Sequence, residues 1–265
     1  MMRRILGKLR RAVVSCAECW HNGSRDPSAP KIVLVTLHKS GSHLIMRLME
    51  LLGFSNVGAS RREVTLNDCS KLRESEYLTS HLPTDISVYP GVRQDVVKIL
   101  FNYRDPRDVC VSTLDFYDWR CKPSAYQEVE FLREAYRNCF RTRGELLTSI
   151  IKADPFSTSP FDLNWYYRSR SLLFHPKVQN IRFEDLVGSK GGGDDELQRE
   201  TIANVCCYLG LQDPDLDFLA ENVYWKDAKT FNRGTIGRWK REFEDAHIEL
   251  FNSLHSDLLA QYGYK

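Results

Sequence analysis

The feature that most constrains the fold of this chain is a short, largely apolar run at residues 31–37, with the sequence KIVLVTL. Because the run offers almost no polar side chains to water, it predicts a β-strand that is covered on both faces. A polar loop follows at 38–42, and apolar residues then recur at helical spacing until Gly53, a residue type that commonly ends helices. A covered strand that leads through a tight loop into a helix is typical of a parallel sheet.

The same alternation of strands and helices continues along the chain. A second buried strand is expected at 95–102, and it leads through Pro106 into a helix at 107–118. Further strands are predicted at 76–81 and 177–183, and further helices at 126–151, 163–174, 196–209 and 242–262. The sequence therefore predicts an α/β fold of three layers, in which helices flank a mostly parallel central sheet. No internal boundary divides 31–265, so we expect this range to form a single domain.

Residues 1–30 are expected to form a separate N-terminal segment. Its first part, MMRRILGKLRRAVVSCAECW, is basic and amphipathic, and residues 21–30 have the composition of a linker. The segment lacks the apolar core and cleavage site of a signal peptide, and no run in the chain is long enough to span a bilayer. Two interpretations stay open: a helix that packs on the domain or is partly frayed, and a helix that makes a weak membrane-surface contact.

The charge and cysteine content narrow the classes of ligand. Lys and Arg number 37 and Asp and Glu number 35, so the formal net charge is only +2 and nothing global indicates a nucleic-acid partner. Any anionic ligand must be held by a local basic cluster. The 8 cysteines are too sparse for a disulfide scaffold, which indicates reduced thiols and a cytoplasmic protein. Cys16 and Cys19 have the spacing of half a zinc site, but no second pair completes it, so no metal is expected.

The loop after the first strand has the composition of a phosphate-binding cradle. Lys39 supplies a positive charge, and Gly41 lets the backbone approach an oxyanion closely. Further donors come from Ser40, Ser42 and His43, at the positive end of a helix dipole. The Walker A pattern is absent, because Lys39 precedes the glycine. The alternative interpretation is an ordinary turn with an exposed lysine.

Three more segments carry candidate binding groups. Arg104 lies at the carboxyl end of a predicted strand, where ligands of open α/β sheets bind, and Ser112 lies on the following helix. The alternative for Arg104 is a surface ion pair with Asp105 or Asp108. His81 follows a third strand, where it is a candidate base or a structural histidine. The glycine-punctuated basic loop at 231–240 is either a lid over an anion or a solvated connection.

Together, these four segments resemble the sulfotransferase family that uses 3′-phosphoadenosine 5′-phosphosulfate (PAPS), in its soluble, small-molecule branch. LHKSGSHL is similar to the 5′-phosphosulfate loop of the family, YRDPRDVCVS to the 3′-phosphate segment, TSHLP to the segment of the catalytic histidine, and NRGTIGRW to the carboxyl-terminal loop. The resemblance covers most of the chain, from about 31 to 249. It implies a P-loop-NTPase-like fold, PAPS as the sulfonate donor, 3′,5′-ADP (PAP) as the product, and no metal.

The resemblance also assigns roles to individual residues. His81 and Lys39 would be catalytic, with His81 as the general base. The 5′-phosphosulfate would be held by Lys39, Ser40, Gly41, Ser42 and His43. The 3′-phosphate and adenine would be held by Leu44, Arg104, Ser112, Phe183, Phe231, Asn232, Arg233 and Gly234.

Several of these positions depart from the family pattern. Leu44 replaces a tryptophan near the adenine, Phe183 replaces a tyrosine and so lacks its hydroxyl, and Asn232 and Arg233 replace an arginine and a lysine. Lys240 and Glu249 match the ends of the family's dimerisation motif, but the centre of that motif differs, which leaves the oligomeric state open.

The expected reaction is transfer of a sulfonate group to a hydroxyl or amine of a small organic acceptor, and the sequence does not identify that acceptor. Two alternatives remain, a nucleotide-dependent kinase and a non-catalytic nucleotide-binding module. A kinase would need a Walker A loop and a Mg²⁺ aspartate. A binding module would keep Lys39 and Arg104 but would not need His81.

Overall fold

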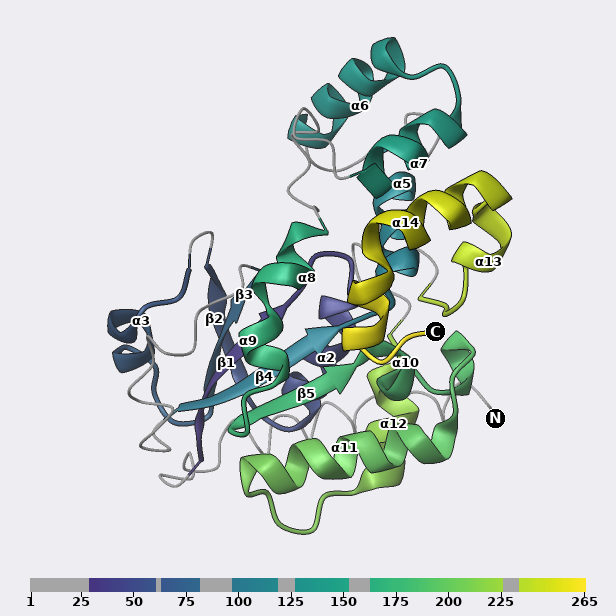
Figure 1. Ribbon diagram of the computed structural model, residues 1–265. Coiled ribbons are helices and arrows are strands. Elements are labelled where there is room, and N and C mark those ends of the chain that lie inside the picture. Colours follow the sequence, from purple (N-terminus) through teal and green to yellow (C-terminus); the bar gives the residue numbers. More distant parts are fainter. Residues whose placement is uncertain (1–28, 61–62, 82–96, 119–126, 153–162, 226–233) are drawn as a thin grey trace, which may run out of the picture.

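The computed structural model describes residues 29–60, 63–81, 97–118, 127–152, 163–225 and 234–265. Its centre is a five-stranded sheet with the order β2-β3-β1-β4-β5 (Figure 1). The strands are β1 (Lys31–Thr36), β2 (Ser55–Ser60), β3 (Glu76–Ser80), β4 (Val97–Tyr103) and β5 (Val178–Arg182). Each neighbouring pair is parallel, so the carboxyl ends of all five strands lie at one edge.

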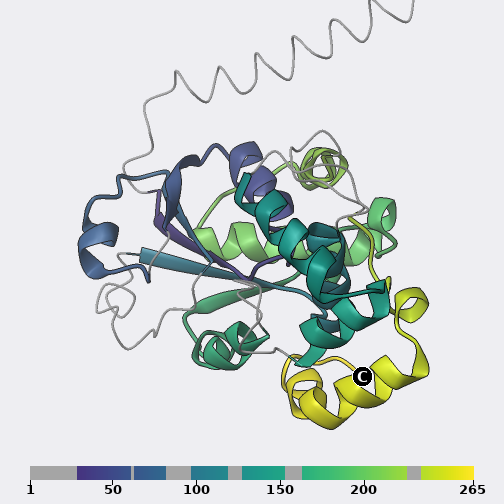
Figure 2. The same ribbon diagram turned by 90° about the horizontal axis from the view of Figure 1, so that it is seen from above.

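The central strand β1 is buried on both faces, as its apolar run predicts. Ile32 and Leu34 face one hydrophobic cluster, and Val33 and Val35 face the other. Figure 2 shows the sheet between α2, α11 and α12 on one side and α8, α9 and α14 on the other. Their bounds are α2 (Ser42–Leu51), α11 (Asp195–Leu209), α12 (Leu216–Val223), α8 (Asn164–Arg168), α9 (Arg170–Leu173) and α14 (Asp245–Gln261). The predicted three-layer α/β fold with a parallel sheet is thus confirmed.

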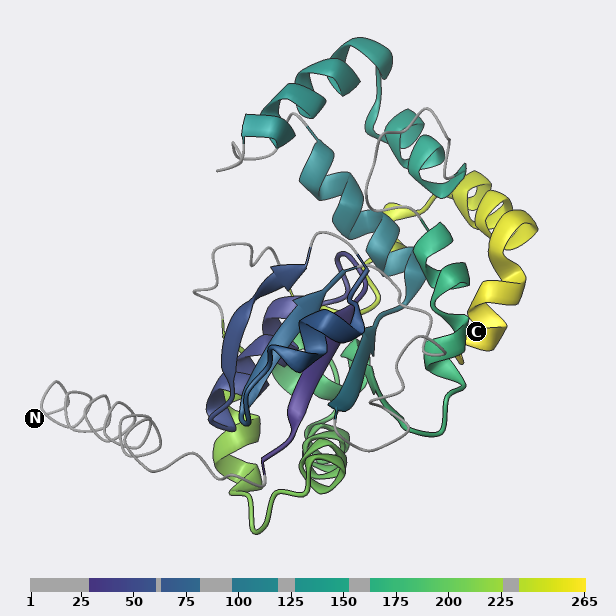
Figure 3. The same cartoon turned by 90° about the vertical axis from the view of Figure 1, so that its left-hand side faces the viewer.

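A helical lobe extends beyond one end of the sheet. It begins with α5 (Pro106–Tyr117), which leaves the carboxyl end of β4, and continues with α6 (Gln127–Cys139) and α7 (Arg143–Lys152). Figure 3 shows this lobe, with α6 farthest from the sheet. The short helix α13 (Trp239–Glu242) packs against α5. In the part of the chain that the structure describes, no helix is long and apolar enough to cross a membrane.

The prediction of one continuous helix at 126–151 is wrong, because residues 140–142 separate α6 from α7. Glu145 donates its backbone N–H to Thr142 Oγ1 over 3.1 Å and accepts from Arg141 N over 2.7 Å, which caps a new helix. The ranges 163–174 and 242–262 are likewise each divided, into α8 and α9 and into the end of α13 and α14. Helical spacing continues across all three breaks, which is why the pattern does not reveal them.

Some elements have no clear signal in the sequence. The edge strand β2 is largely exposed and contains Gly58, so it lacks an apolar pattern. Four short or unexpected helices are α3 (Leu66–Ser70), α10 (Phe183–Leu186), α12 and a 3₁₀ turn at Ser189–Gly191. The two interpretations of the N-terminal segment concern residues outside the described part of the chain, except for its last two positions, 29 and 30.

Candidate functional site

The loop between β1 and α2 holds its shape through its own hydrogen bonds. Ser40 is fully buried, and its hydroxyl donates to the Leu37 carbonyl over 2.6 Å. Asn102, at the end of β4, donates from Nδ2 to Ser40 Oγ over 2.9 Å. Lys39 and Gly41 adopt positive φ angles of 61° and 91°, so the chain reverses sharply before α2 begins. The Ser40 side chain, which the sequence analysis placed on a phosphate, therefore builds the loop from inside.

Gly41 makes room for an aromatic ring. A Cβ atom at this position would collide with the ring of Phe183, lying 2.7 Å from its Cε2 atom. Phe183 is buried and begins α10 directly after β5. The lack of a side chain at Gly41 was expected to let an oxyanion approach the backbone. It also leaves space for the Phe183 ring beneath the loop.

His81 lies half-buried at the end of β3, next to the end of β1. Its Nδ1 atom is 3.0 Å from the Thr36 carbonyl oxygen and 3.0 Å from Thr36 Oγ1. Because a carbonyl oxygen can only accept, Nδ1 carries the hydrogen, and Nε2 of the neutral ring is a proton acceptor. Ser42 donates its hydroxyl to Thr36 Oγ1 over 2.8 Å, and the His38 ring stacks on His81 with centroids 4.5 Å apart.

The three histidines around the loop are held in their neutral form. Burial lowers the pKa of His81 from its ordinary value, although the Thr36 carbonyl opposes the shift. Burial, followed by the charges of His81 and Lys39, lowers the pKa of His38 to about 3. The same three causes lower the pKa of His43. At neutral pH all three imidazoles are therefore uncharged.

Lys39 extends over the first helix of the lobe. Its Nζ atom lies 4.0 Å from the ring centroid of Phe116 on α5, which is a cation–π distance. Burial is the main cause that lowers the pKa of Lys39 to about 8, with Arg104 and Arg133 contributing and Asp115 opposing. The lysine is thus mostly charged at neutral pH, but a modest rise in pH removes the charge.

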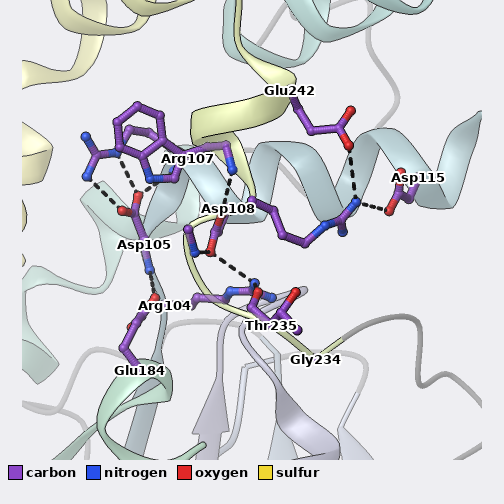
Figure 4. Close-up of polar contacts among 12 residues, drawn as sticks. Arg104, Asp105, Arg107, Asp108, Asp115, Glu184, Gly234, Thr235 and Glu242 are labelled. Carbon is purple, nitrogen blue, oxygen red and sulfur yellow. Dashed lines mark hydrogen bonds and ion pairs between the residues drawn. The ribbon is translucent and has the colours of Figure 1, made fainter. Parts of the chain in front are cut away.

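Arg104 is buried at the end of β4 and faces the same region. Its Nη2 atom donates to the Thr235 carbonyl over 2.7 Å and to Asp108 Oδ2 over 3.2 Å (Figure 4). Its guanidinium lies 4.4 Å from the Phe183 ring centroid. Its Nε atom is buried and has no hydrogen-bond partner among the residues that the structure describes. The ion pair with Asp108 does form, but inside the protein rather than at the surface.

The remaining candidates differ in how the structure places them. Ser112 lies half-buried on α5, two turns after Asp105, and Leu44 lies on α2 against the hydrophobic cluster that contains Ile32 and Leu34. Gly234 lies beside the 3₁₀ turn, where a Cβ on Gly191 would come within 2.6 Å of the Gly234 oxygen. Phe231, Asn232 and Arg233 lie outside the described residues.

Four residues of the site were not predicted to bind or build it. Thr36 holds His81, Asn102 holds the loop, Phe116 contacts Lys39, and Asp108 accepts a hydrogen bond from the backbone N–H of Gly237. Thr36 and Asn102 pair with each other at the carboxyl end of the β1–β4 ladder, and this position at the strand ends is the signal that could have identified them. Within the described residues, no group of three or more His, Cys, Asp or Glu side chains forms a site for a metal ion.

Comparison with known proteins identifies a curated relative of the chain. No protein-family model matches the chain. A curated relative, the 3-alpha-hydroxysteroid sulfotransferase of Cavia porcellus, is 23% identical over 219 residues, which are 73% of this chain and 66% of the relative, just under two thirds of its length.

Solved structures show the same fold. Mouse sulfotransferase SULT7A1 complexed with PAP has a TM-score of 0.59 at 17% identity, over 87% of this chain and 84% of that chain. Retinol dehydratase in complex with androsterone and PAP has a TM-score of 0.52 at 15% identity, over 94% of this chain and 85% of that chain. The chain therefore has the fold of these sulfotransferase structures.

The close approach of Phe183 to Gly41 gives a prediction about stability. We expect Gly41→Ala to lower the free energy of unfolding by about 2–4 kcal/mol, because the new Cβ adds overpacking to left-handed strain. Gly210→Ala is the matched control, since Gly210 has a φ of 76° and a Cβ there would meet no atom within 4 Å, so it adds the strain alone. Urea unfolding of both variants measures the difference, and equal losses would contradict the contact.

Proposed function

We propose that this protein transfers a sulfonate group from PAPS to a hydroxyl or amine of a small organic acceptor. The observation that carries the proposal is the meeting of three groups at one edge of the sheet. These are the loop of Lys39, the buried Arg104 with an unpartnered Nε among the described residues, and His81 with its acceptor nitrogen. Solved relatives add support, because they contain PAP, and retinol dehydratase was solved with androsterone and with retinol.

The described residues fit the two phosphate ends of the cofactor. Lys39, Ser42 and His43 would hold the 5′-phosphosulfate at the start of α2, while Ser40 and Gly41 fix the shape of the loop. Arg104, Ser112 and Gly234 would hold the 3′-phosphate, and the orphaned Nε of Arg104 supplies a donor for it. Leu44, Phe183, Phe231, Asn232 and Arg233 would complete the adenine and 3′-phosphate contacts.

PAPS would supply an activated sulfonate with a phosphate as leaving group. His81 would take the proton of the acceptor at Nε2, while its Nδ1–H donates to the Thr36 carbonyl. That carbonyl would offset the positive charge that develops on the ring. Lys39 would stabilise negative charge on the leaving phosphate oxygen. No residue role in this scheme requires a metal.

The first experiment tests the base. We expect His81→Ala to lower transfer to a hydroxyl acceptor by about 10²–10⁴-fold while PAPS affinity changes little, because a general base acts on the transition state. The measurement is an acceptor screen by mass spectrometry for the gain of one SO₃. His175→Ala, outside the site, is the control. PAP binding with no transfer by the wild type on any acceptor would favour a non-catalytic binding module, and full activity in His81→Ala would exclude the role of His81.

A second experiment tests which phosphate Arg104 contacts. Arg104→Ala should weaken binding of PAP at least tenfold more than binding of 5′-AMP, since a charge-assisted hydrogen bond contributes about 1.5–3 kcal/mol. Isothermal titration calorimetry gives, for each nucleotide, the ratio of the Kd of the variant to the Kd of the wild type. Arg199→Ala removes an exposed arginine that pairs with Asp217 and should change neither. Equal losses for the two ligands would show that Arg104 does not contact the 3′-phosphate.

A third experiment uses the lowered pKa of Lys39. Below pH 8 the lysine is already charged, so affinity for PAP should depend little on this group. Above about pH 8 the free protein must take up a proton to bind the anion, so affinity should fall with rising pH, at most about tenfold per unit. Lys39→Arg keeps its charge over this range and should flatten the profile. Identical profiles in the two proteins would mean that the Lys39 charge does not act on the ligand.

A further inference from the structure

The Asp108 carboxylate makes an unusual set of contacts for an ion-pair partner. Its side chain is 0% exposed, in the first turn of α5. Oδ2 accepts from the backbone N–H of Gly237 over 2.8 Å and from Arg104 Nη2 over 3.2 Å, and Oδ1 accepts from the backbone N–H of Trp239 over 3.0 Å (Figure 4). Two of these three donors therefore belong to a distant stretch of backbone.

The same stretch, residues 234–239, which we call the carboxyl-terminal segment, is held by the neighbouring side chains. Arg104 donates from Nη2 to the Thr235 carbonyl over 2.7 Å. The guanidinium of Arg107 lies 3.9 Å from the centroid of the Trp239 ring, and Asp105 fixes that guanidinium with bonds of 3.0 and 2.7 Å. On the other side, Ile236 donates its N–H to the Gly191 carbonyl over 3.0 Å.

The balance of charge and hydrogen bonding explains why a carboxylate is tolerated at this depth. A fully buried carboxylate is costly unless its oxygens are paired, and removal of one partner leaves the other uncompensated. Here one guanidinium and two amide groups share the two oxygens. An apolar side chain would leave the amides of Gly237 and Trp239 without these acceptors, and an asparagine would keep an acceptor for only one of them.

We propose that Asp108 is a positioning residue that docks the carboxyl-terminal segment onto α5 and, through the shared oxygen, orients Arg104. The proposal rests on the proposed function, in which Arg104 contacts the 3′-phosphate. If the Asp108 carboxylate served only as a counterion, it would weaken the electrostatic attraction between Arg104 and an anion. Removing its charge would then tighten PAP binding. A docking carboxylate has the opposite effect, because its removal loosens both the segment and the arginine.

The sign of the change in PAP affinity therefore tests the proposal. Asp108→Asn keeps the shape but replaces one acceptor oxygen by an NH₂ group, which cannot accept from a backbone amide. We expect the Kd for PAP to rise about 10- to 100-fold, as loss of charge-assisted hydrogen bonds implies, with a much smaller rise for 5′-AMP. Amide hydrogen exchange at Gly237 and Trp239 should become faster in the nucleotide-free variant.

The control is a carboxylate that also accepts from a backbone amide, but at the start of another helix. Asp215 caps α12, where its side chain accepts from the backbone N–H of Phe218 over 3.0 Å. Asp215→Ala should lower the unfolding temperature through loss of the cap while leaving PAP affinity and the exchange at Gly237 and Trp239 as in the wild type. This separates docking from a general loss of stability.

Two results overturn the proposal: PAP binding that is unchanged or tighter in Asp108→Asn, or exchange at Gly237 and Trp239 that is unchanged. If Asp108→Asn does not fold, Asp108→Glu retains the charge but displaces the carboxylate by one methylene, and the same two measurements apply. Failure of the proposed function is distinguishable, because a wild type that does not bind PAP refutes the nucleotide site, while the exchange measurement still reports on docking.

Discussion

The in-register pairing of β1 with both of its neighbours is the constraint on which the site depends. Thr36 pairs with Asn102 of β4, and Val35 pairs with Ser80 of β3, so the last residues of three strands reach the same edge. The hydrogen bonds from His81 to Thr36 and from Asn102 to Ser40 then follow from this register. A shift of one residue in either pairing would reverse the faces of a strand and separate these contacts.

The helix α5 extends this arrangement away from the sheet. Asp108, Ser112, Asp115 and Phe116 recur along it at spacings of three and four, so they share one side of the helix. Three of them contact groups from other segments, since Asp108 accepts from Gly237, Asp115 pairs with Arg143 and Arg238, and Phe116 lies under Lys39. Because β4 leads directly into α5 through a cap in which Asp105 accepts from Arg107 N, the helix has a fixed starting point.

Much of the fold, and part of the site, is predictable from the sequence. The covered strand at 31–37 and the strand before Arg104 have strong apolar patterns, and those patterns give the correct parallel sheet. The break at 140–142 is set by capping contacts that periodicity does not record, and the break between α8 and α9 lies at Ser169, which has a non-helical ψ of 5°. Within the site, Lys39, Arg104 and His81 follow from their places after strands. The inward use of Ser40 and the docking contacts of Asp108 depend on residues distant in sequence, so no local pattern reveals them.

The stacked histidines have a consequence for the kind of molecule that this edge of the sheet favours. His38 and His81 are both neutral at physiological pH, whereas the half-buried Lys39 and the buried Arg104 carry positive charge. The charged groups at this edge therefore lie where α5 and β4 meet, with Asp108 and Asp115 beside the two cations, whereas the groups beside β3 are uncharged. An elongated molecule with an anionic head and a neutral tail binds more favourably with its head near Lys39 and Arg104 than in the reverse orientation. The polarity of the protein surface would in this way align such a molecule before any bond is made or broken.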